Sequence, residues 1–162
     1  MPKYSTDDIR NVAFVGHGGA GKTTLVESIL HLTGTINQPG NVEKGSTVCD
    51  YDAEEKEHQH SLAAAVVHCD HGGVHYNLID TPGFPDFIGQ ALCCLPAVET
   101  AAIVINAQQG IEMVTRRMMD RAKEADLCRM IVINKINAEN VDLGSIVDQV
   151  RETFGSECLP IN

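Results

Sequence analysis

The segment from Gly16 to Thr24 constrains the fold of this chain more than any other. It reads Gly-His-Gly-Gly-Ala-Gly-Lys-Thr-Thr and fits the pattern G-x-x-x-x-G-K-[ST] of a phosphate-binding loop. A short apolar run, residues 11–15, precedes it, and a run with helical spacing, residues 22–32, follows. Glycines let successive backbone N–H groups face one phosphate chain, and the start of a helix adds positive charge. A chance Lys-Thr pair in a glycine-rich turn is the alternative, and the flanking strand and helix argue against it.

Such a loop implies roles for its side chains. The Lys22 ammonium reaches the β- and γ-phosphates of a nucleotide, and the Thr23 hydroxyl ligates Mg²⁺. We therefore expect a phosphate-binding set made of His17, Gly18, Gly19, Ala20, Gly21, Lys22, Thr23 and Thr24.

A second motif, Asp80-Thr81-Pro82-Gly83, follows an apolar strand. An acidic residue that closes a strand beside a phosphate-binding loop holds Mg²⁺, usually through water. The N–H of Gly83 can then face the γ-phosphate, so Lys22 and Gly83 are the candidate catalytic groups. A plain Pro-Gly turn is the alternative.

Apolar and helix-like runs alternate along the 162 residues, which predicts one α/β domain with a mostly parallel sheet. We expect strands at 11–15, 62–69, 73–79, 100–106 and 129–134, with a hairpin turn at Asp70-His71-Gly72-Gly73. Helices are expected over 22–32, from about Pro85, over 111–125 and over 143–154. Residues 33–61 are rich in turn residues and are predicted to form a functional or mobile loop.

Charge and composition exclude several classes of protein. The net charge of −10 makes direct binding to a nucleic-acid backbone unfavourable. No apolar run approaches the ~20 residues of a membrane span, and the first eight residues are too polar for the core of a signal peptide. Six scattered cysteines without a Cys-x-x-Cys pair suggest reduced thiols. We therefore expect a cytoplasmic protein.

A third motif, Asn134-Lys135-Ile136-Asn137, follows the last apolar strand. It is similar to the Asn-Lys-x-Asp box that binds guanine, although a polar strand end would look the same. With the other two motifs, with Asp8 to Val12 and with Asp50 to Lys56, the chain resembles the translational GTPases, above all elongation factor G and its divergent paralogues.

The resemblance implies a three-layer P-loop fold with one antiparallel edge hairpin, GTP or GDP and Mg²⁺ as cofactors, and a switch that works on the ribosome. It implies that Asn134, Lys135 and Asn137 contact the nucleotide base. It also implies that Asp80 and Ser61 help Thr23 to bind Mg²⁺. It also leads us to expect an incomplete GTP-binding domain over 1–162, without its last strand and helix, since no Ser-Ala loop follows Asn137.

The chain departs from the family pattern around the expected γ-phosphate position. Phe84 stands where elongation factors carry His, and a phenyl ring cannot hydrogen-bond the attacking water. We therefore expect slow intrinsic hydrolysis. The family segment Arg-Gly-Ile-Thr-Ile is replaced by His58-Gln59-His60-Ser61-Leu62, in which Ser61 keeps a hydroxyl for Mg²⁺.

The third departure is Asn137 in place of aspartate. An amide offers one acceptor and one donor where a carboxylate accepts twice, so one guanine donor meets a donor. Such a mismatch costs about 1–3 kcal/mol, or about tenfold to a hundredfold in affinity. We predict a weakened preference for guanine and better binding of xanthine.

Three other groups of residues favour ordinary structural interpretations. His58, His60, His68, His71 and His75, with Cys69 among them, match no zinc spacing, and the histidines are expected to be solvated. The acidic run from Asp50 to Glu57 is expected to be a solvated part of the loop, and Met113, Met118 and Met119 to be packing residues.

These observations favour a GTPase switch domain. A nucleotide-binding regulatory module with little hydrolysis is the second hypothesis, supported by Phe84. An ATP-using P-loop protein is the third, and Asn137 keeps it open.

Overall fold

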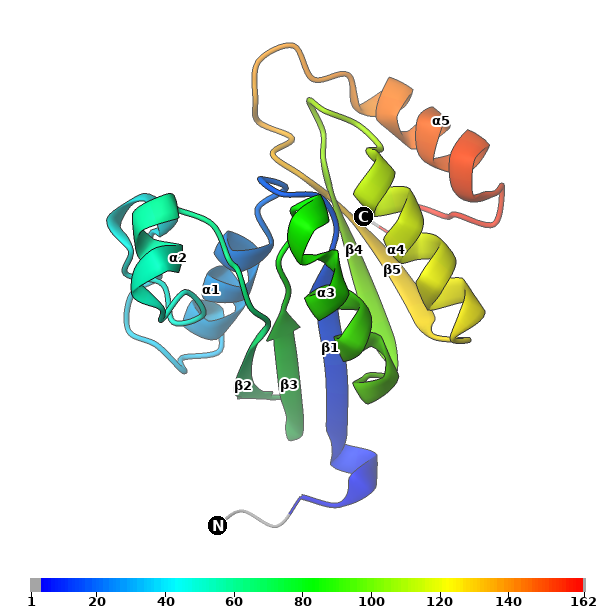
Figure 1. The fold of residues 1–162 in the computed structure, drawn as a ribbon. Coiled ribbons are helices and arrows are strands. Elements are labelled where there is room, and N and C mark those ends of the chain that lie inside the picture. Colours follow the sequence, from blue (N-terminus) through cyan, green and yellow to red (C-terminus); the bar gives the residue numbers. More distant parts are fainter. Residues whose placement is uncertain (1–3, 162) are drawn as a thin grey trace.

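A five-stranded sheet in the order β2-β3-β1-β4-β5 forms the centre of the computed structural model, which describes residues 4–161 (Figure 1). The strands are β1 (Ile9–Val15), β2 (Ala65–His71), β3 (Val74–Asp80), β4 (Thr100–Asn106) and β5 (Cys128–Asn134). β1 pairs in parallel with β3 and β4, and β4 with β5, whereas β2 is antiparallel to β3. The predicted α/β fold with one antiparallel edge hairpin is confirmed.

Helices cover both faces of the sheet. They are α1 (Lys22–Leu32), α2 (Ala53–His58), α3 (Ile88–Cys94), α4 (Met113–Glu124) and α5 (Leu143–Phe154). Short 3₁₀ segments lie at Thr6–Asp8, Val42–Lys44, Pro85–Phe87 and Leu95–Ala97. None of the helices between residues 4 and 161 is long and apolar enough to cross a membrane.

The alternation of side chains along the central strands builds two cores. Ala13, Val15 and Ile103 pack with the buried faces of α3, α4 and α5. Phe14 and Val104 point the other way and pack with α1. Because residues 13–15 of β1 and 101–105 of β4 are buried on both faces, they read in sequence as continuous apolar runs.

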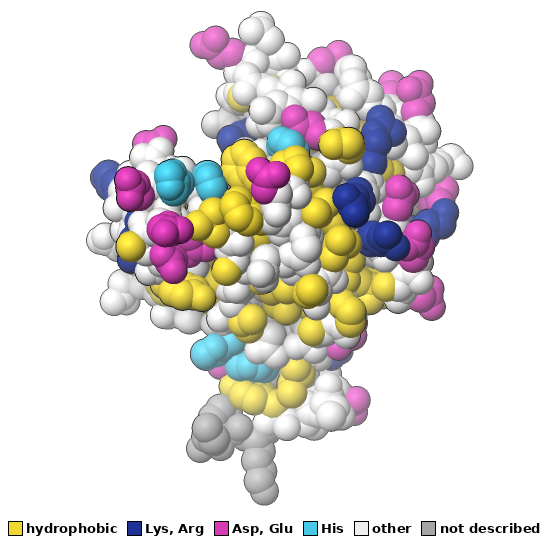
Figure 2. All heavy atoms as spheres, viewed as in Figure 1, with side chains coloured by type: hydrophobic (Ala, Val, Ile, Leu, Met, Phe, Trp, Pro, Cys, Tyr) yellow, Lys and Arg dark blue, Asp and Glu magenta, His cyan; other side chains and the backbone are white. Residues whose placement is uncertain are grey.

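The outer surface over α3 and α4 is divided between two kinds of side chain (Figure 2). Hydrophobic side chains cover its middle, whereas the outer side of α4 carries Arg116, Arg117, Arg121 and Lys123, all exposed. The acidic chain therefore has a locally basic helix.

The structure corrects the prediction for residues 33–61 and for the hairpin. Residues 53–58 form α2, whose start is fixed by a capping box between Asp52 and Glu55. β2 continues to His71, so the turn is tighter than predicted and lies at Gly72 and Gly73, both with positive φ. Pro85 opens a 3₁₀ turn, and α3 begins only at Ile88.

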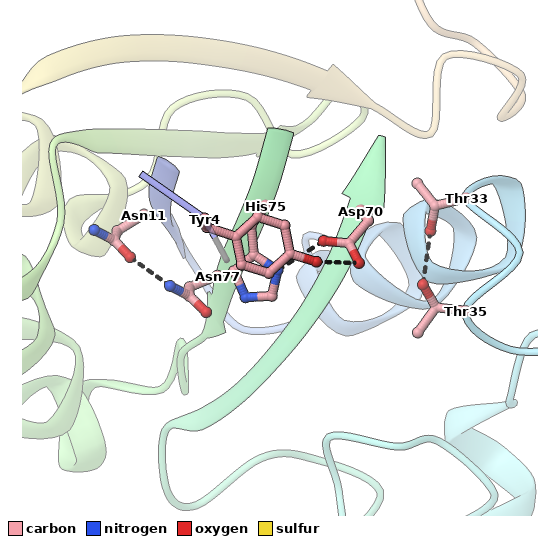
Figure 3. Close-up of polar contacts among 7 residues, drawn as sticks. All are labelled: Tyr4, Asn11, Thr33, Thr35, Asp70, His75 and Asn77. Atoms are coloured by element: carbon pink, nitrogen blue, oxygen red, sulfur yellow. Dashed lines mark hydrogen bonds and ion pairs between the residues drawn. The ribbon is translucent and has the colours of Figure 1, made fainter. Parts of the chain in front are cut away.

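The expected solvated histidines divide into two groups. His68, His71 and His58 are exposed, but His75 stacks on Tyr4 at a centroid distance of 4.5 Å. Asp70 accepts hydrogen bonds from the Tyr4 hydroxyl (2.9 Å) and the His75 ring (2.7 Å), which join residues far apart in sequence (Figure 3). Among residues 4–161, no group of three or more His, Cys, Asp or Glu side chains is placed to hold a metal ion.

Candidate functional site

The glycines of the phosphate-binding loop have the conformations that the motif requires. Gly21, the N-cap of α1, has φ 90°, and Gly16 has φ 137°, where a Cβ would strike the carbonyl of Val104. These are left-handed or related conformations that L side chains rarely adopt. The chain can therefore wrap the start of α1 only with glycine at these two positions.

Lys22 lies inside this wrap with 6% of its surface exposed. Its ammonium donates to the carbonyls of Gly16 (3.0 Å) and His17 (2.9 Å). Burial lowers the pKa of Lys22 to about 8, although the nearby Asp80 carboxylate acts in the opposite direction. A buried cation of this kind is ready to pair with an anion.

The Asp80 carboxylate links the end of β3 to the phosphate-binding loop. Its Oδ2 accepts a hydrogen bond of 2.6 Å from the Thr23 hydroxyl, and its buried Oδ1 has no partner among the described residues. Burial raises the pKa of Asp80 to about 6. An acceptor that is buried without a partner indicates a site for a cation or a water.

Ser61 joins the same group from the loop before β2. Its Oγ lies 3.4 Å from the Thr23 hydroxyl and donates to Oδ1 of Asp50 at 2.7 Å. Asp50 is 2% exposed, so the prediction of a solvated acidic run is wrong at this residue. The structure thus brings the three predicted metal-site residues, Thr23, Ser61 and Asp80, together and adds Asp50 behind them.

Two buried glutamates hold the segment between α1 and β2. Glu27 of α1, with none of its surface exposed, accepts from the backbone N–H groups of Gly40 (2.6 Å) and Val48 (2.5 Å). Glu55, 2% exposed, accepts from Leu62 (2.9 Å) and Ala63 (3.1 Å). The prediction of a solvated run is therefore also wrong at Glu55, whereas Asp52, Glu54 and Glu57 are exposed as expected.

Gly83, from the second motif, contacts the phosphate-binding loop at Gly18. Its carbonyl accepts a hydrogen bond of 2.9 Å from the N–H of Gly18, and a Cβ at Gly83 would lie 2.5 Å from that nitrogen. Phe84 covers Gly18 so closely that a Cβ there would lie 2.9 Å from the phenyl ring. Only glycines allow this approach of the two motifs.

The third motif lies beside the loop and is less buried. Asn134 donates from Nδ2 to the carbonyl of Ala20 at 2.9 Å and accepts from the N–H of Lys135. Lys135 has φ 58°, and both Lys135 and Asn137 are exposed. Asn134 and Lys135 therefore meet the phosphate-binding loop, whereas no hydrogen bond joins Asn137 to it.

A cavity of ≈ 250 Å³ lies between these motifs. Its lining includes Gly18, Gly19, Gly21, Lys22, Thr23, Thr24, Asp50, His60, Ser61, Gly83, Phe84 and Lys135. A larger cavity of ≈ 580 Å³ lies between β5 and α5 and has none of the motif residues in its wall. The smaller cavity is therefore the candidate site, because the motif residues line it and do not line the larger one.

His17 and Ala20 contribute through the backbone, since the carbonyl of each accepts a hydrogen bond. Nε2 of the His17 ring lies 3.0 Å from the carboxylate of Glu112, just before α4, and His17 does not line the cavity. Sequence reasoning missed Glu112, Asp50 and Glu27, because each acts through a contact between distant segments. Glu55 could have been found, since Asp52 and Glu55 have capping-box spacing.

The strand, glycine-rich loop and helix, together with the acidic residue at the end of the neighbouring strand, define a P-loop nucleotide-binding α/β domain. Comparison with known proteins narrows this class. Residues 7–160 match the family described as the elongation factor Tu GTP binding domain. The chain belongs to this family and is a translational GTPase domain of the elongation factor G-like type.

Several relatives are longer proteins that this chain matches over part of their length. An elongation factor G-like protein of Mycobacterium tuberculosis is 35% identical over 94% of this chain and 21% of its own length. The tetracycline resistance protein TetW of Butyrivibrio fibrisolvens is 35% identical over 93% of this chain and 24% of its own. A crystal structure from Thermus thermophilus has a TM-score of 0.87 at 36% identity, over 91% of this chain and 22% of that one. The chain thus spans about a fifth to a quarter of the length of these proteins.

Proposed function

We propose that this domain binds a guanine nucleotide with Mg²⁺, hydrolyses the terminal phosphate and thereby acts as a conformational switch in a translation factor of the elongation factor G type. One observation carries the proposal. Lys22 and Thr23 line one cavity beside the phosphate-binding loop, and Asp80, with its unpartnered Oδ1, lies directly behind Thr23 and accepts a hydrogen bond from its hydroxyl.

The phosphate chain would lie along the loop from His17 to Thr24. The backbone N–H groups of Gly19, Gly21 and Thr24 and the Lys22 ammonium would neutralise its charge. Lys22 would exchange the carbonyls of Gly16 and His17 for phosphate oxygens. Most of the catalysis would then be positioning and electrostatic stabilisation, to which Lys22 and Gly83 contribute.

The residues on the metal side fit Mg²⁺, which prefers oxygen ligands. Thr23 and Ser61 supply hydroxyl oxygens, and Asp80 supplies the buried oxygen that no described residue satisfies. When bound, Mg²⁺ neutralises charge on the β- and γ-phosphates. Asp50 would hold Ser61 in place through the hydrogen bond of 2.7 Å.

The base would lie against Asn134, Lys135 and Asn137. Asn134 is fixed by its bond to Ala20, whereas Asn137 is exposed and free to meet the edge of a base. Because an amide presents one donor and one acceptor, Asn137 suits xanthine better than an aspartate would.

The ribosome is the proposed partner and the cytoplasm the proposed compartment, on the analogy of the elongation factor G-like relatives. The net charge of −10 leaves little of this domain suited to contact RNA directly. The proposed switch segments, around residues 33–62 and 83–90, and the parts that accompany this domain in longer relatives would provide most of the contact.

A regulatory module that binds nucleotide and hardly hydrolyses it is the second candidate. Phe84 favours it, because a phenyl ring at the usual position of histidine offers no hydrogen bond to water. Binding and turnover therefore need separate measurements.

The test is direct binding of GDP, XDP and ADP to the chain with Mg²⁺ at one salt concentration, followed by single-turnover cleavage of GTP with and without ribosomes. Binding of GDP or XDP well above ADP, with measurable cleavage, supports the switch. Binding without cleavage under both conditions supports the regulatory module. ADP binding equal to that of GDP and XDP contradicts a guanine-type site.

A further inference from the structure

The cavity contains an imidazole on the side where Phe84 cannot form hydrogen bonds. The His60 ring lies against the Phe84 ring, with centroids 4.7 Å apart and an interplanar angle of 52°. His60, Phe84, Lys22 and Gly83 all line the cavity of ≈ 250 Å³. His60 also directly precedes Ser61, whose hydroxyl lies 3.4 Å from that of Thr23.

The ring nitrogens of His60 form no hydrogen bond with the described residues, although its backbone N–H donates to the carbonyl of Glu55 at 3.2 Å. Its Nδ1 is buried, and no described residue forms a hydrogen bond with it. Buried polar groups in folded proteins nearly always have a partner, so an unpaired ring nitrogen in a cavity wall indicates a missing ligand or water.

His17 is the other imidazole close to Phe84, and its geometry excludes it from the same role. Its ring centroid is 6.5 Å from that of Phe84 and its Nε2 is 3.0 Å from the carboxylate of Glu112. Its Nδ1, like that of His60, is buried without a partner among the described residues, but His17 does not line the cavity. His60 is therefore the imidazole available to a bound nucleotide.

We infer that His60 is the residue that positions the attacking water, in place of a histidine at position 84. This inference rests on the proposed hydrolase function. The water oxygen forms a bond to the γ-phosphorus while the bond from that phosphorus to the β–γ bridging oxygen breaks. The proton of the water passes to phosphate oxygens, and the products are GDP and inorganic phosphate. His60 holds the water by one hydrogen bond and returns to the same protonation state.

The surrounding rings explain how His60 keeps its position. Phe84 supports one side of the imidazole, Phe87 lies 6.2 Å away and His58 stacks from the solvent side at 5.9 Å. A side chain can orient water only if its ring is held, and this packing supplies the support.

Two substitutions separate water positioning from packing. His60→Phe keeps an aromatic ring against Phe84 and removes hydrogen bonding. His60→Gln removes the ring and keeps groups that donate and accept, as the water-orienting glutamine of other GTPases does. The matched control is His71→Phe, at an exposed histidine of β2 that does not line the cavity.

The experiment measures single-turnover cleavage of Mg²⁺-GTP by excess protein, with and without ribosomes, and the affinity for a fluorescent GDP. We expect His60→Phe to slow cleavage by about tenfold or more at unchanged GDP affinity. We expect His60→Gln to be faster than His60→Phe, and His71→Phe to match the wild type. Cleavage by His60→Phe at the wild-type rate overturns the inference, and so does His60→Gln slower than or equal to His60→Phe.

A second readout does not depend on turnover. The ¹⁵N resonances of His60, assigned by their loss in His60→Phe, should shift when Mg²⁺-GTPγS replaces Mg²⁺-GDP. Unchanged resonances overturn the inference. Failure of the wild type to bind either nucleotide overturns the proposed function, and the inference with it. Wild-type binding without cleavage under both conditions overturns hydrolysis and the role of His60 but leaves nucleotide binding standing.

Discussion

The two ends of the proposed nucleotide site differ in how firmly their side chains are held before a ligand binds. At the phosphate end, Lys22 and Asp80 are almost fully buried and hold fixed partners on neighbouring segments. At the base end, Lys135 and Asn137 are exposed, and one hydrogen bond, from Asn134 to Ala20, ties the motif to the loop.

Because of this difference, we expect the two ends to contribute differently to nucleotide binding. A preorganised group loses little freedom when a ligand arrives, so the phosphate end should supply most of the binding free energy. Exposed side chains must first be ordered by the base, so the base end should contribute selectivity more than affinity. Four substitutions test whether the phosphate end provides affinity and the base end provides selectivity.

Lys22→Met removes the cation of the phosphate end and should have the largest effect. Bonds from a charged donor contribute about 1.5–3 kcal/mol each, so losing two of them lowers GDP affinity by about a thousandfold. The melting temperature should not fall, because a buried cation is replaced by an apolar side chain. Titration calorimetry with Mg²⁺-GDP and a thermal melt measure both. Lys56→Met, at an exposed lysine, is the control. A loss of affinity below tenfold would disprove this assignment of affinity to the phosphate end.

Glu27→Ala tests whether the segment over the phosphate end is held by its buried carboxylate. The substitution removes the acceptor of two backbone N–H groups and should lower the free energy of unfolding by about 3 kcal/mol. Urea denaturation measures the change, with the exposed Glu43→Ala as control. Equal stability of the two variants would show that the segment is held by other contacts.

Asn137→Asp tests the base end alone. A carboxylate accepts from both guanine donors, so the ratio of GDP to XDP affinity should rise by about tenfold to a hundredfold, corresponding to about 1–3 kcal/mol. Asn140→Asp places the same charge nearby and should leave the ratio unchanged. Competition binding of GDP against XDP gives the ratio, and an unaltered ratio in Asn137→Asp would contradict the amide argument.

Asp70→Asn acts far from the cavity and should have the smallest effect. The hydrogen bonds from His75 and Tyr4 lower the pKa of Asp70 below its ordinary value. The carboxylate therefore stabilises the fold above the unfolded pKa of about 4, and this stabilisation is lost as the pH falls through the folded pKa. Thermal melts should show Asp70→Asn less stable than wild type at pH 7 and equal to it at pH 2.5. The exposed Asp120→Asn should differ from wild type at neither pH, and a difference for Asp70→Asn that persists at pH 2.5 would refute the assignment.

Sequence reasoning predicted what depends on neighbouring residues. The phosphate-binding loop, α1, β4 and α5 lie where their patterns placed them, because strand, turn and helix signals are local. The convergence of Thr23, Asp80 and Ser61 followed from the family resemblance and the order of the motifs.

What sequence reasoning missed depends on long-range contacts. Asp50 and Glu55 lie in an acidic run that reads as solvated, and only the folded loop shows that Ser61, Leu62 and Ala63 bury them. His60 was grouped with the other histidines, because nothing in its spacing reveals that Phe84 packs against it. The roles of the individual site residues and the extent of the domain stay predictions.

The carboxylate of Glu27 has a consequence for the kinetics of the loop. Since one side chain of α1 anchors the amides of Gly40 and Val48, releasing either should release both. Opening of this segment is then a local unfolding reaction with its own free energy, below that of the whole domain. Hydrogen–deuterium exchange would register it as two amides of equal protection, separated by residues that exchange faster.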